Sequence, residues 1–174
     1  NYFLCTLFAD EELEILDYNR VVKDLNGNSK EEFLEKIKER FQVSEPGTEA
    51  VSPREKGEFG MYLEDRWYKL NIKDTYRSED VVDGLDVALL QNNLLEPVLG
   101  IREPAKDPRI DFIGGIRGLD ELEKRVHTDC KAAFSMYPTS MKELFAVADA
   151  GRLMPPKSTW FEPKLRSGLF IHRI

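Results

Sequence analysis

The residues best suited to chemistry lie near the end of the chain, where Lys157, Ser158 and Thr159 follow Pro155 and Pro156. An ammonium group and two hydroxyl groups are donors that hold phosphate or carboxylate oxygens. Two prolines restrict the backbone, so such a loop would lose little conformational entropy when a ligand binds. The stretch therefore predicts an anion-binding loop. The alternative is a packed connection in which the same polar atoms bond to the backbone.

The charge distribution favours a small anion at this loop. Residues 152–174 hold five basic residues and one acidic residue, whereas the whole chain carries a formal net charge of −7. The remaining chain is therefore strongly acidic, which disfavours binding to nucleic acid or to an anionic membrane surface. We expect no nucleic-acid partner and no membrane partner for this chain.

Four further residues join the candidate site by their positions. Arg117 lies in a turn with three glycines between a predicted strand and a predicted helix, where free backbone N–H groups can hold an anion. The turn matches neither standard nucleotide-binding glycine motif, so a tight strand-to-helix turn is the simpler interpretation. Asn19 and Arg20 are predicted at a strand end, where sites on sheets commonly lie. His172 falls in the last predicted strand, at a core position or at the site.

The sequence contains little that could hold a metal or act as a nucleophile. His127 and His172 are its two histidines, and no set of histidine, cysteine and acidic residues has the spacing of metal ligands. Cys5 and Cys130 are expected to be buried, reduced thiols in a cytoplasmic protein. We therefore expect no metal, no cofactor and no disulfide, and we assign no catalytic residue.

The pattern of expected helices and strands predicts an α+β fold. The chain has 174 residues, of which 41% are hydrophobic and 33% charged, which suits one domain with a buried core. Alternating apolar residues predict an antiparallel front half that includes a hairpin over residues 58–74. The back half alternates as β-α-β-α-β, which predicts crossover connections and some parallel pairing in a mixed sheet.

Local signals mark most of the individual elements. Capping boxes at Ser29 and Ser140, each with a glutamate three residues later, predict two helix starts. The apolar run over residues 81–101 predicts a central helix. The other expected elements are a helix over residues 119–130 and strands over residues 2–8, 13–22, 41–47, 109–115, 131–137 and 167–174, the last of them inside the sheet.

Two stretches carry a family resemblance: DYNRVVKDLNG at residues 17–27 and AVADAGRLMPPKSTWFEPKLRSGLFIHRI at residues 146–174. They resemble the carboxy-terminal half of a bacterial family called domain of unknown function 1015. Full-length members carry an upstream Asp-Gly-His-His-Arg motif, which is similar to ParB-like partition proteins and to relatives that phosphorylate free serine. That motif is absent here. The resemblance places Asn19, Arg20, Lys157, Ser158, Thr159 and His172 in the most recognisable blocks of the family.

The strand pattern begins directly after Asn1, so we expect residues 1–174 to be a single-domain, carboxy-terminal fragment of a longer protein. Three functions stay open. The first is binding of a small anionic metabolite together with a missing amino-terminal region. The second is an interaction domain that packs on that region or on a second copy. The third is a ParB-like role, in serine phosphorylation or DNA partition, that resides in the missing region. The fragment itself is expected to be non-catalytic.

Overall fold

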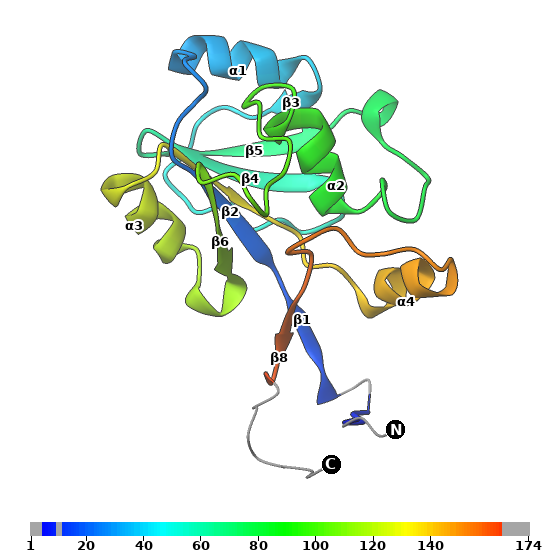
Figure 1. Ribbon diagram of the computed structural model, residues 1–174. Coiled ribbons are helices and arrows are strands. Elements are labelled where there is room, and N and C mark those ends of the chain that lie inside the picture. Colours follow the sequence, from blue (N-terminus) through cyan, green and yellow to red (C-terminus); the bar gives the residue numbers. More distant parts are fainter. Residues whose placement is uncertain (1–4, 10–11, 165–174) are drawn as a thin grey trace.

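A six-stranded sheet with the spatial order β3-β5-β4-β7-β2-β6 forms the centre of the computed structural model, which describes residues 5–9 and 12–164 (Figure 1). A separate two-stranded ribbon pairs β1 with β8. The strands of the sheet are β3 (Phe41–Val43), β5 (Arg66–Ile72), β4 (Glu58–Leu63), β7 (Ala132–Ser135), β2 (Tyr18–Val22) and β6 (Ile110–Gly114), and those of the ribbon are β1 (Glu14–Leu16) and β8 (Trp160–Glu162).

The strand pairing confirms the α+β class and the antiparallel hairpin, and corrects one detail. Every pair of neighbouring strands in the described ranges is antiparallel, so the parallel pairing expected for a mixed sheet does not occur there. The unit β6-α3-β7, with α3 spanning Asp120–Thr128, does cross over, and its two strands run in the same direction. However, β2 lies between them and pairs antiparallel with both. A strand inserted from far along the chain leaves no local signal.

Side-chain alternation gives the sheet two apolar faces. Neighbouring residues of β2 show the division, because Val22 packs in a large cluster with Phe33 of α1 (Lys30–Lys38), whereas Val21 packs in a smaller cluster with Leu122 of α3. The large cluster also contains every residue of α2 (Asp86–Leu90) except Asp86 itself. The molecule therefore has a helix α2 face and a helix α3 face, one on each side of the sheet.

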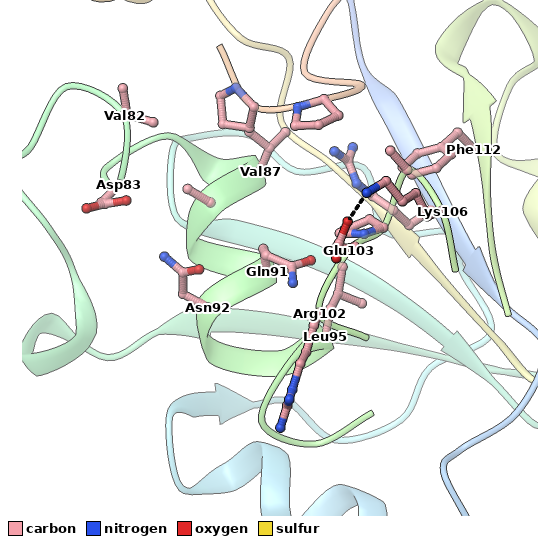
Figure 2. A pocket seen from close by; sticks show the side chains of 16 residues that line it. Val82, Asp83, Val87, Gln91, Asn92, Leu95, Arg102, Glu103, Lys106 and Phe112 are labelled. Carbon is pink, nitrogen blue, oxygen red and sulfur yellow. Dashed lines mark ion pairs between the residues drawn. The ribbon is translucent and has the colours of Figure 1, made fainter. Parts of the chain in front are cut away.

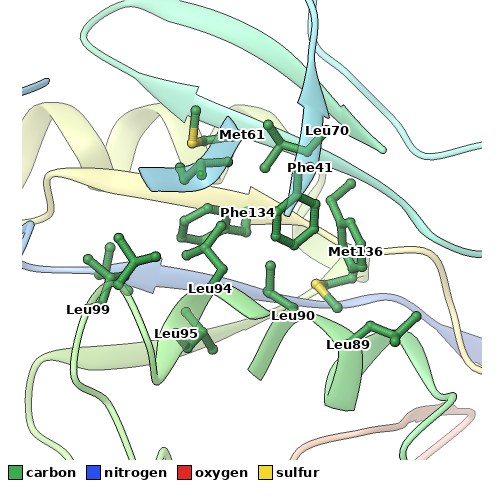
Figure 3. Packing of buried hydrophobic residues seen from close by; sticks show 14 of the residues in the cluster. Phe41, Met61, Leu70, Leu89, Leu90, Leu94, Leu95, Leu99, Phe134 and Met136 are labelled. Carbon is green, nitrogen blue, oxygen red and sulfur yellow. The ribbon is translucent and has the colours of Figure 1, made fainter. Parts of the chain in front are cut away.

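The central helix is confirmed in place but is shorter than residues 81–101. α2 continues as a π-helical turn, Gln91–Leu95, and a further turn follows until Gly100, where the chain leaves the helical path. In a π-helical turn the carbonyl of Asn92 would accept from residue 97, but that residue is Pro97, which has no N–H. Figure 3 shows Leu90 and Leu94 of this segment beside Phe134. Burial against the sheet explains why the segment is apolar around most of its circumference.

The two capping boxes are confirmed. Ser29 and Ser140 each accept a hydrogen bond from the backbone of the glutamate three residues later, and that glutamate bonds back to the cap. They open α1 and α4 (Met141–Asp149). No helix within residues 5–9 and 12–164 is long and apolar enough to cross a membrane.

The first predicted strand is wrong in its described part. Residues 5–9 form no strand, Leu7 is 90% exposed, and Cys5 is exposed rather than buried. The stretch 13–22 instead divides into β1 and β2, and β1 takes β8 from the far end of the chain as its partner. This pairing is not local, so the apolar run at residues 2–8 suggested the wrong neighbour. The last predicted strand, residues 167–174, and its His172 lie outside the described residues.

Candidate anion-binding site

Arg20 is a buried cation at the middle of β2. In register it lies opposite Phe112 of β6, and alternation places its side chain with Val22 on the helix α2 face. Only 3% of the residue is exposed. The guanidinium lies 5.5 Å from the centroid of the Phe112 ring, Nη2 donates to the carbonyl oxygen of Lys157 at 3.0 Å, and Nη1 donates to the carbonyl oxygen of Tyr18.

The charge of Arg20 has no carboxylate counter-ion within 4.0 Å in the described part of the chain. Burial lowers the pKa of Arg20 to about 10, so the guanidinium is still protonated at neutral pH. A buried charge is costly unless it is paired. Five other arginines form ion pairs with carboxylates: Arg77, Arg109, Arg117, Arg125 and Arg152.

Arg20 lines a cavity of about 450 Å³ (Figure 2). Its walls come from the sheet, from the turn at residues 82–83, from α2 and the π-helical turn after it, from the loop of residues 102–106, and from Pro155 and Pro156. Most of the walls are apolar, with a few polar groups among them, which is the usual make-up of a small-molecule pocket. The polar and charged residues of the lining are Arg20, Asp83, Gln91, Asn92, Arg102, Glu103 and Lys106.

Gln91 gives the cavity wall an unsatisfied acceptor. Its Nε2 donates to the carbonyl oxygen of Ile101 at 2.7 Å, which fixes the orientation of the amide. Its Oε1 is buried and is the sole buried side-chain nitrogen or oxygen without a hydrogen-bond partner in the described residues. Glu103 and Lys106 pair with each other at 2.6 Å in the same lining (Figure 2). The lining thus includes a buried cation, an ion pair and a glutamine whose buried Oε1 has no described partner.

The structure brings Lys157 next to Arg20, as the sequence suggested. The Lys157 backbone has a φ of 58°, and its carbonyl accepts the Arg20 hydrogen bond. The Lys157 ammonium lies 5.8 Å from the centroid of the Tyr18 ring and 5.9 Å from that of Phe112. The side chain itself lines a second cavity of about 710 Å³, with Thr159 in the same lining. Pro155 borders both cavities, so the loop separates them.

Ser158 is used within the loop. Its hydroxyl donates to the carbonyl of Pro155, and its own carbonyl accepts from the Thr139 hydroxyl at 3.1 Å. Only 5% of Ser158 is exposed. In this geometry its proton closes the turn, while the Lys157 ammonium stays exposed.

Asn19 and Arg117 lie away from the 450 Å³ cavity. Asn19 is fully buried, and its Oδ1 accepts from the backbone N–H of Met136 at 2.9 Å, which extends the contact between β2 and β7. Arg117 is exposed and pairs with Glu121 at 3.7 Å. The glycine turn beside it serves packing, because a Cβ on Gly114 would lie 2.5 Å from the indole ring of β8.

Sequence reasoning missed Gln91, Arg102 and Lys106. A signal for two of them existed in the stretch IREPAKDPR, which places basic residues and prolines between a helix and a strand. Gln91 carried no such signal, since one amide in an apolar helical run has many possible roles. Within the described ranges no group of three or more histidine, cysteine and acidic residues could hold a metal ion. Burial raises the pKa of the Cys130 thiol to about 11, so this residue is protonated at neutral pH.

A buried acid lies at the start of α2. Asp86 is 7% exposed, and its two oxygens accept from the backbone N–H of Gly57 at 2.9 and 3.2 Å. Burial raises the pKa of Asp86 to about 7, and nearby Glu143 acts in the same direction. Lys56 and the Gly57 hydrogen bond act the other way. The next residue, Val87, lines the 450 Å³ cavity, so Asp86 lies directly beside the cavity lining in the sequence.

The sequence model of the family described as protein of unknown function (DUF1015) matches residues 1–88. This is more than half of the chain, and the chain belongs to that family. The family prediction is therefore confirmed, while the ParB-like upstream half stays a prediction. No curated protein matches the sequence.

The fold is similar to solved structures of free serine kinase. A mutant of that enzyme in complex with AMP is 18% identical, with a TM-score of 0.51 over 87% of this chain and 55% of that chain. The enzyme in complex with AMP and a mutant in complex with ADP are each 16% identical, with a TM-score of 0.51 and 54% of that chain covered. At such identity the likeness establishes the fold alone, and the chain spans about half the length of these kinases.

Proposed function

We propose that this chain binds a small anionic ligand in the 450 Å³ cavity, with the anionic group beside Arg20. One observation carries the proposal: Arg20 is buried and charged, lines a cavity, and lacks a carboxylate partner in the described residues. A phosphate or carboxylate there would supply the missing counter-charge and accept charge-assisted hydrogen bonds. The carbonyls of Tyr18 and Lys157 already hold the guanidinium in place, so little ordering is needed on binding.

The ligand class follows from the cavity and from the fold comparison. The apolar walls suit an organic body attached to the anion, as in a phosphorylated metabolite. The similar kinase structures hold AMP or ADP, which makes adenine nucleotides the first ligands to test. Because those kinases extend well beyond the matched part, we further propose that another region of a longer cytoplasmic protein completes the site. The loop with Lys157 would then face that region.

The test is calorimetric titration of the chain with AMP, ADP and inorganic phosphate. We expect Arg20→Gln to weaken binding of the nucleotides by about ten- to a hundredfold, the size of one charged hydrogen bond. Arg54→Gln, at an exposed arginine outside the cavity, is the matched control and should leave binding unchanged. Equal loss in both variants would contradict the proposal.

A cavity-filling variant guards against misfolding of the Arg20 variant. Ala105 is exposed and lines the cavity, so Ala105→Trp should obstruct it without disturbing the core. Ala148→Trp, at an exposed position on α4, is the control. Nucleotide binding that survives Ala105→Trp unchanged would place the ligand elsewhere.

A second candidate function is an interaction domain, which the surface near α4 favours. Leu153 is 88% exposed and Phe145 of α4 is 53% exposed. Exposed apolar side chains of this kind suit contact with another protein region or with a second copy. Light scattering of the purified chain would detect a homodimer, and Leu153→Ser should dissociate it if this surface forms the interface. A monomeric chain that still binds nucleotide would support the first function and contradict the interaction domain.

A further inference from the structure

We propose that Arg40 and Arg102 form a second anion site that takes a phosphoryl dianion. Both residues line a pocket of about 790 Å³. This pocket adjoins the 450 Å³ cavity, because Asn92 and Arg102 belong to both linings. The other residues of the lining are Glu96, Pro97 and Gly100.

Arg40 is held in position by the fold. It lies directly before β3, and its Nη1 donates to the carbonyl oxygen of Asn92 at 3.0 Å. That carbonyl is free because Pro97 cannot supply the N–H that a continued π-helical turn would need. The guanidinium also lies 5.5 Å from the centroid of the Tyr76 ring. One edge of the guanidinium is thus fixed, and its remaining N–H groups have no hydrogen-bond partner in the part of the chain that the structure describes.

Arg102 reaches the same pocket from the loop that follows Gly100. Gly100 has a φ of 68°, which turns the chain out of the helical segment. Figure 2 shows the Arg102 guanidinium extending away from Gln91 and Lys106. Among residues 5–9 and 12–164, Arg102 has neither a hydrogen bond nor an ion pair within 4.0 Å. Its guanidinium is therefore available to a ligand.

The charges in this pocket favour a dianion over a single carboxylate. Two guanidinium groups lining one pocket repel each other unless an anion lies between them. Glu96 lines the same pocket, yet neither arginine pairs with it or with any other carboxylate that the structure describes. Guanidinium groups match phosphate oxygens in planar, paired hydrogen bonds, so two of them suit a phosphoryl group.

The second site shares Asn92 and Arg102 with the lining of the first cavity, but it is proposed independently of the function above. It needs neither Arg20 nor the nucleotides expected in the first cavity. Inorganic phosphate and pyrophosphate are therefore the probes, and phosphate binding would survive a failure of the nucleotide proposal.

The experiment is calorimetric titration of the full chain with pyrophosphate and then with phosphate at about 150 mM salt, near physiological ionic strength. Arg102→Gln should weaken binding about tenfold or more, as loss of a charged hydrogen bond does. The matched controls are Arg54→Gln and Arg66→Gln, two exposed arginines outside the pocket, which should change affinity less than about twofold. Arg40→Gln combined with Arg102→Gln should abolish binding.

Each outcome decides the proposal. Arg40→Gln disturbs the contact with Asn92, so the test rests on Arg102→Gln, which breaks no described bond and should keep the melting temperature. Absence of pyrophosphate binding by the unmodified chain would overturn the second site. Equal weakening by Arg102→Gln and Arg66→Gln would overturn it as well, because it would indicate a diffuse charge effect. Loss of binding on Arg20→Gln would assign the anion to the first cavity instead.

Discussion

The two faces of the sheet differ in whether their buried polar groups have partners. On the helix α3 face, the Trp67 indole donates to Glu123 at 2.7 Å, and Asn19 accepts from the backbone N–H of Met136, directly after β7. On the helix α2 face, Arg20 lacks a described carboxylate and Gln91 keeps an unpartnered acceptor. Buried polar groups are normally satisfied, so the unpartnered Gln91 acceptor and the Arg20 charge without a described carboxylate are the observations behind the proposed ligand site. The larger hydrophobic cluster and the 450 Å³ cavity both lie on the α2 face.

The largest expected effect separates stability from binding. Leu94 and Leu122 are fully buried on the α2 and α3 faces respectively. Each change to alanine should destabilise the protein by about 2–5 kcal/mol through lost contacts and a cavity. Leu94→Ala should also weaken AMP binding, because the adjacent Leu95 lines the ligand cavity, whereas Leu122→Ala should not. Urea denaturation and calorimetry measure the two quantities, and equal binding by both variants would remove the distinction between the faces.

The pH dependence of stability should follow Asp86 on the α2 side. Its folded-state pKa of about 7 lies above the ordinary 3.8, so the folded state holds the proton more tightly and stability falls as pH rises from about 4 to 7. Asp86→Asn should remove this slope and stabilise the protein at pH 8 by on the order of 2 kcal/mol. Asp149→Asn, at an exposed position on α4, is the control. Identical pH profiles for Asp86→Asn and the unmodified chain would contradict the assignment.

A smaller effect is expected from the paired indole on the α3 face. Trp67→Phe keeps most of the ring but removes the hydrogen bond to Glu123. The expected cost is about 1–3 kcal/mol in unfolding free energy, with no change in AMP affinity. Thermal denaturation and calorimetry check both parts. A loss of affinity would show that the α3 face also contributes to the ligand site.

The smallest effect concerns His127, whose Nε2 lies 2.7 Å from Asp65 Oδ1 on the surface of the same face. Both side chains are largely exposed, so solvent screens the contact. His127→Gln should change stability by less than about 1 kcal/mol. A larger loss in chemical denaturation would mean that this surface contact matters more than its exposure suggests.

Local signals predicted the fold where neighbouring residues decide it. The capping box at Ser29 and the hairpin of β4 and β5 need only a few consecutive residues, and both were predictable. The insertion of β2 between β6 and β7, and the partnership of β1 with β8, depend on segments far apart in the chain. Hydrophobic periodicity carries no information about such partners.

The candidate site was predictable in part for the same reason. Arg20 and Lys157 were named from the sequence, and the fold places them in contact. Arg40, Gln91 and Arg102 were not named, because each lies in a different element and only the folded sheet brings them near one cavity system. The sequence does not show which arginines form ion pairs, so the lack of a carboxylate partner at Arg20 can be recognised only in the folded structure.

The place of β2 in the sheet also sets an order of assembly. Both of its partners, β6 and β7, follow residue 109, so the ribosome releases β2 long before either neighbour exists. Until then both of its edges are unpaired and open to association with other chains. Pairing across so long a separation closes a large loop, which slows folding. The pocket around Arg20 therefore forms only after the residues of β6 and β7 have been made.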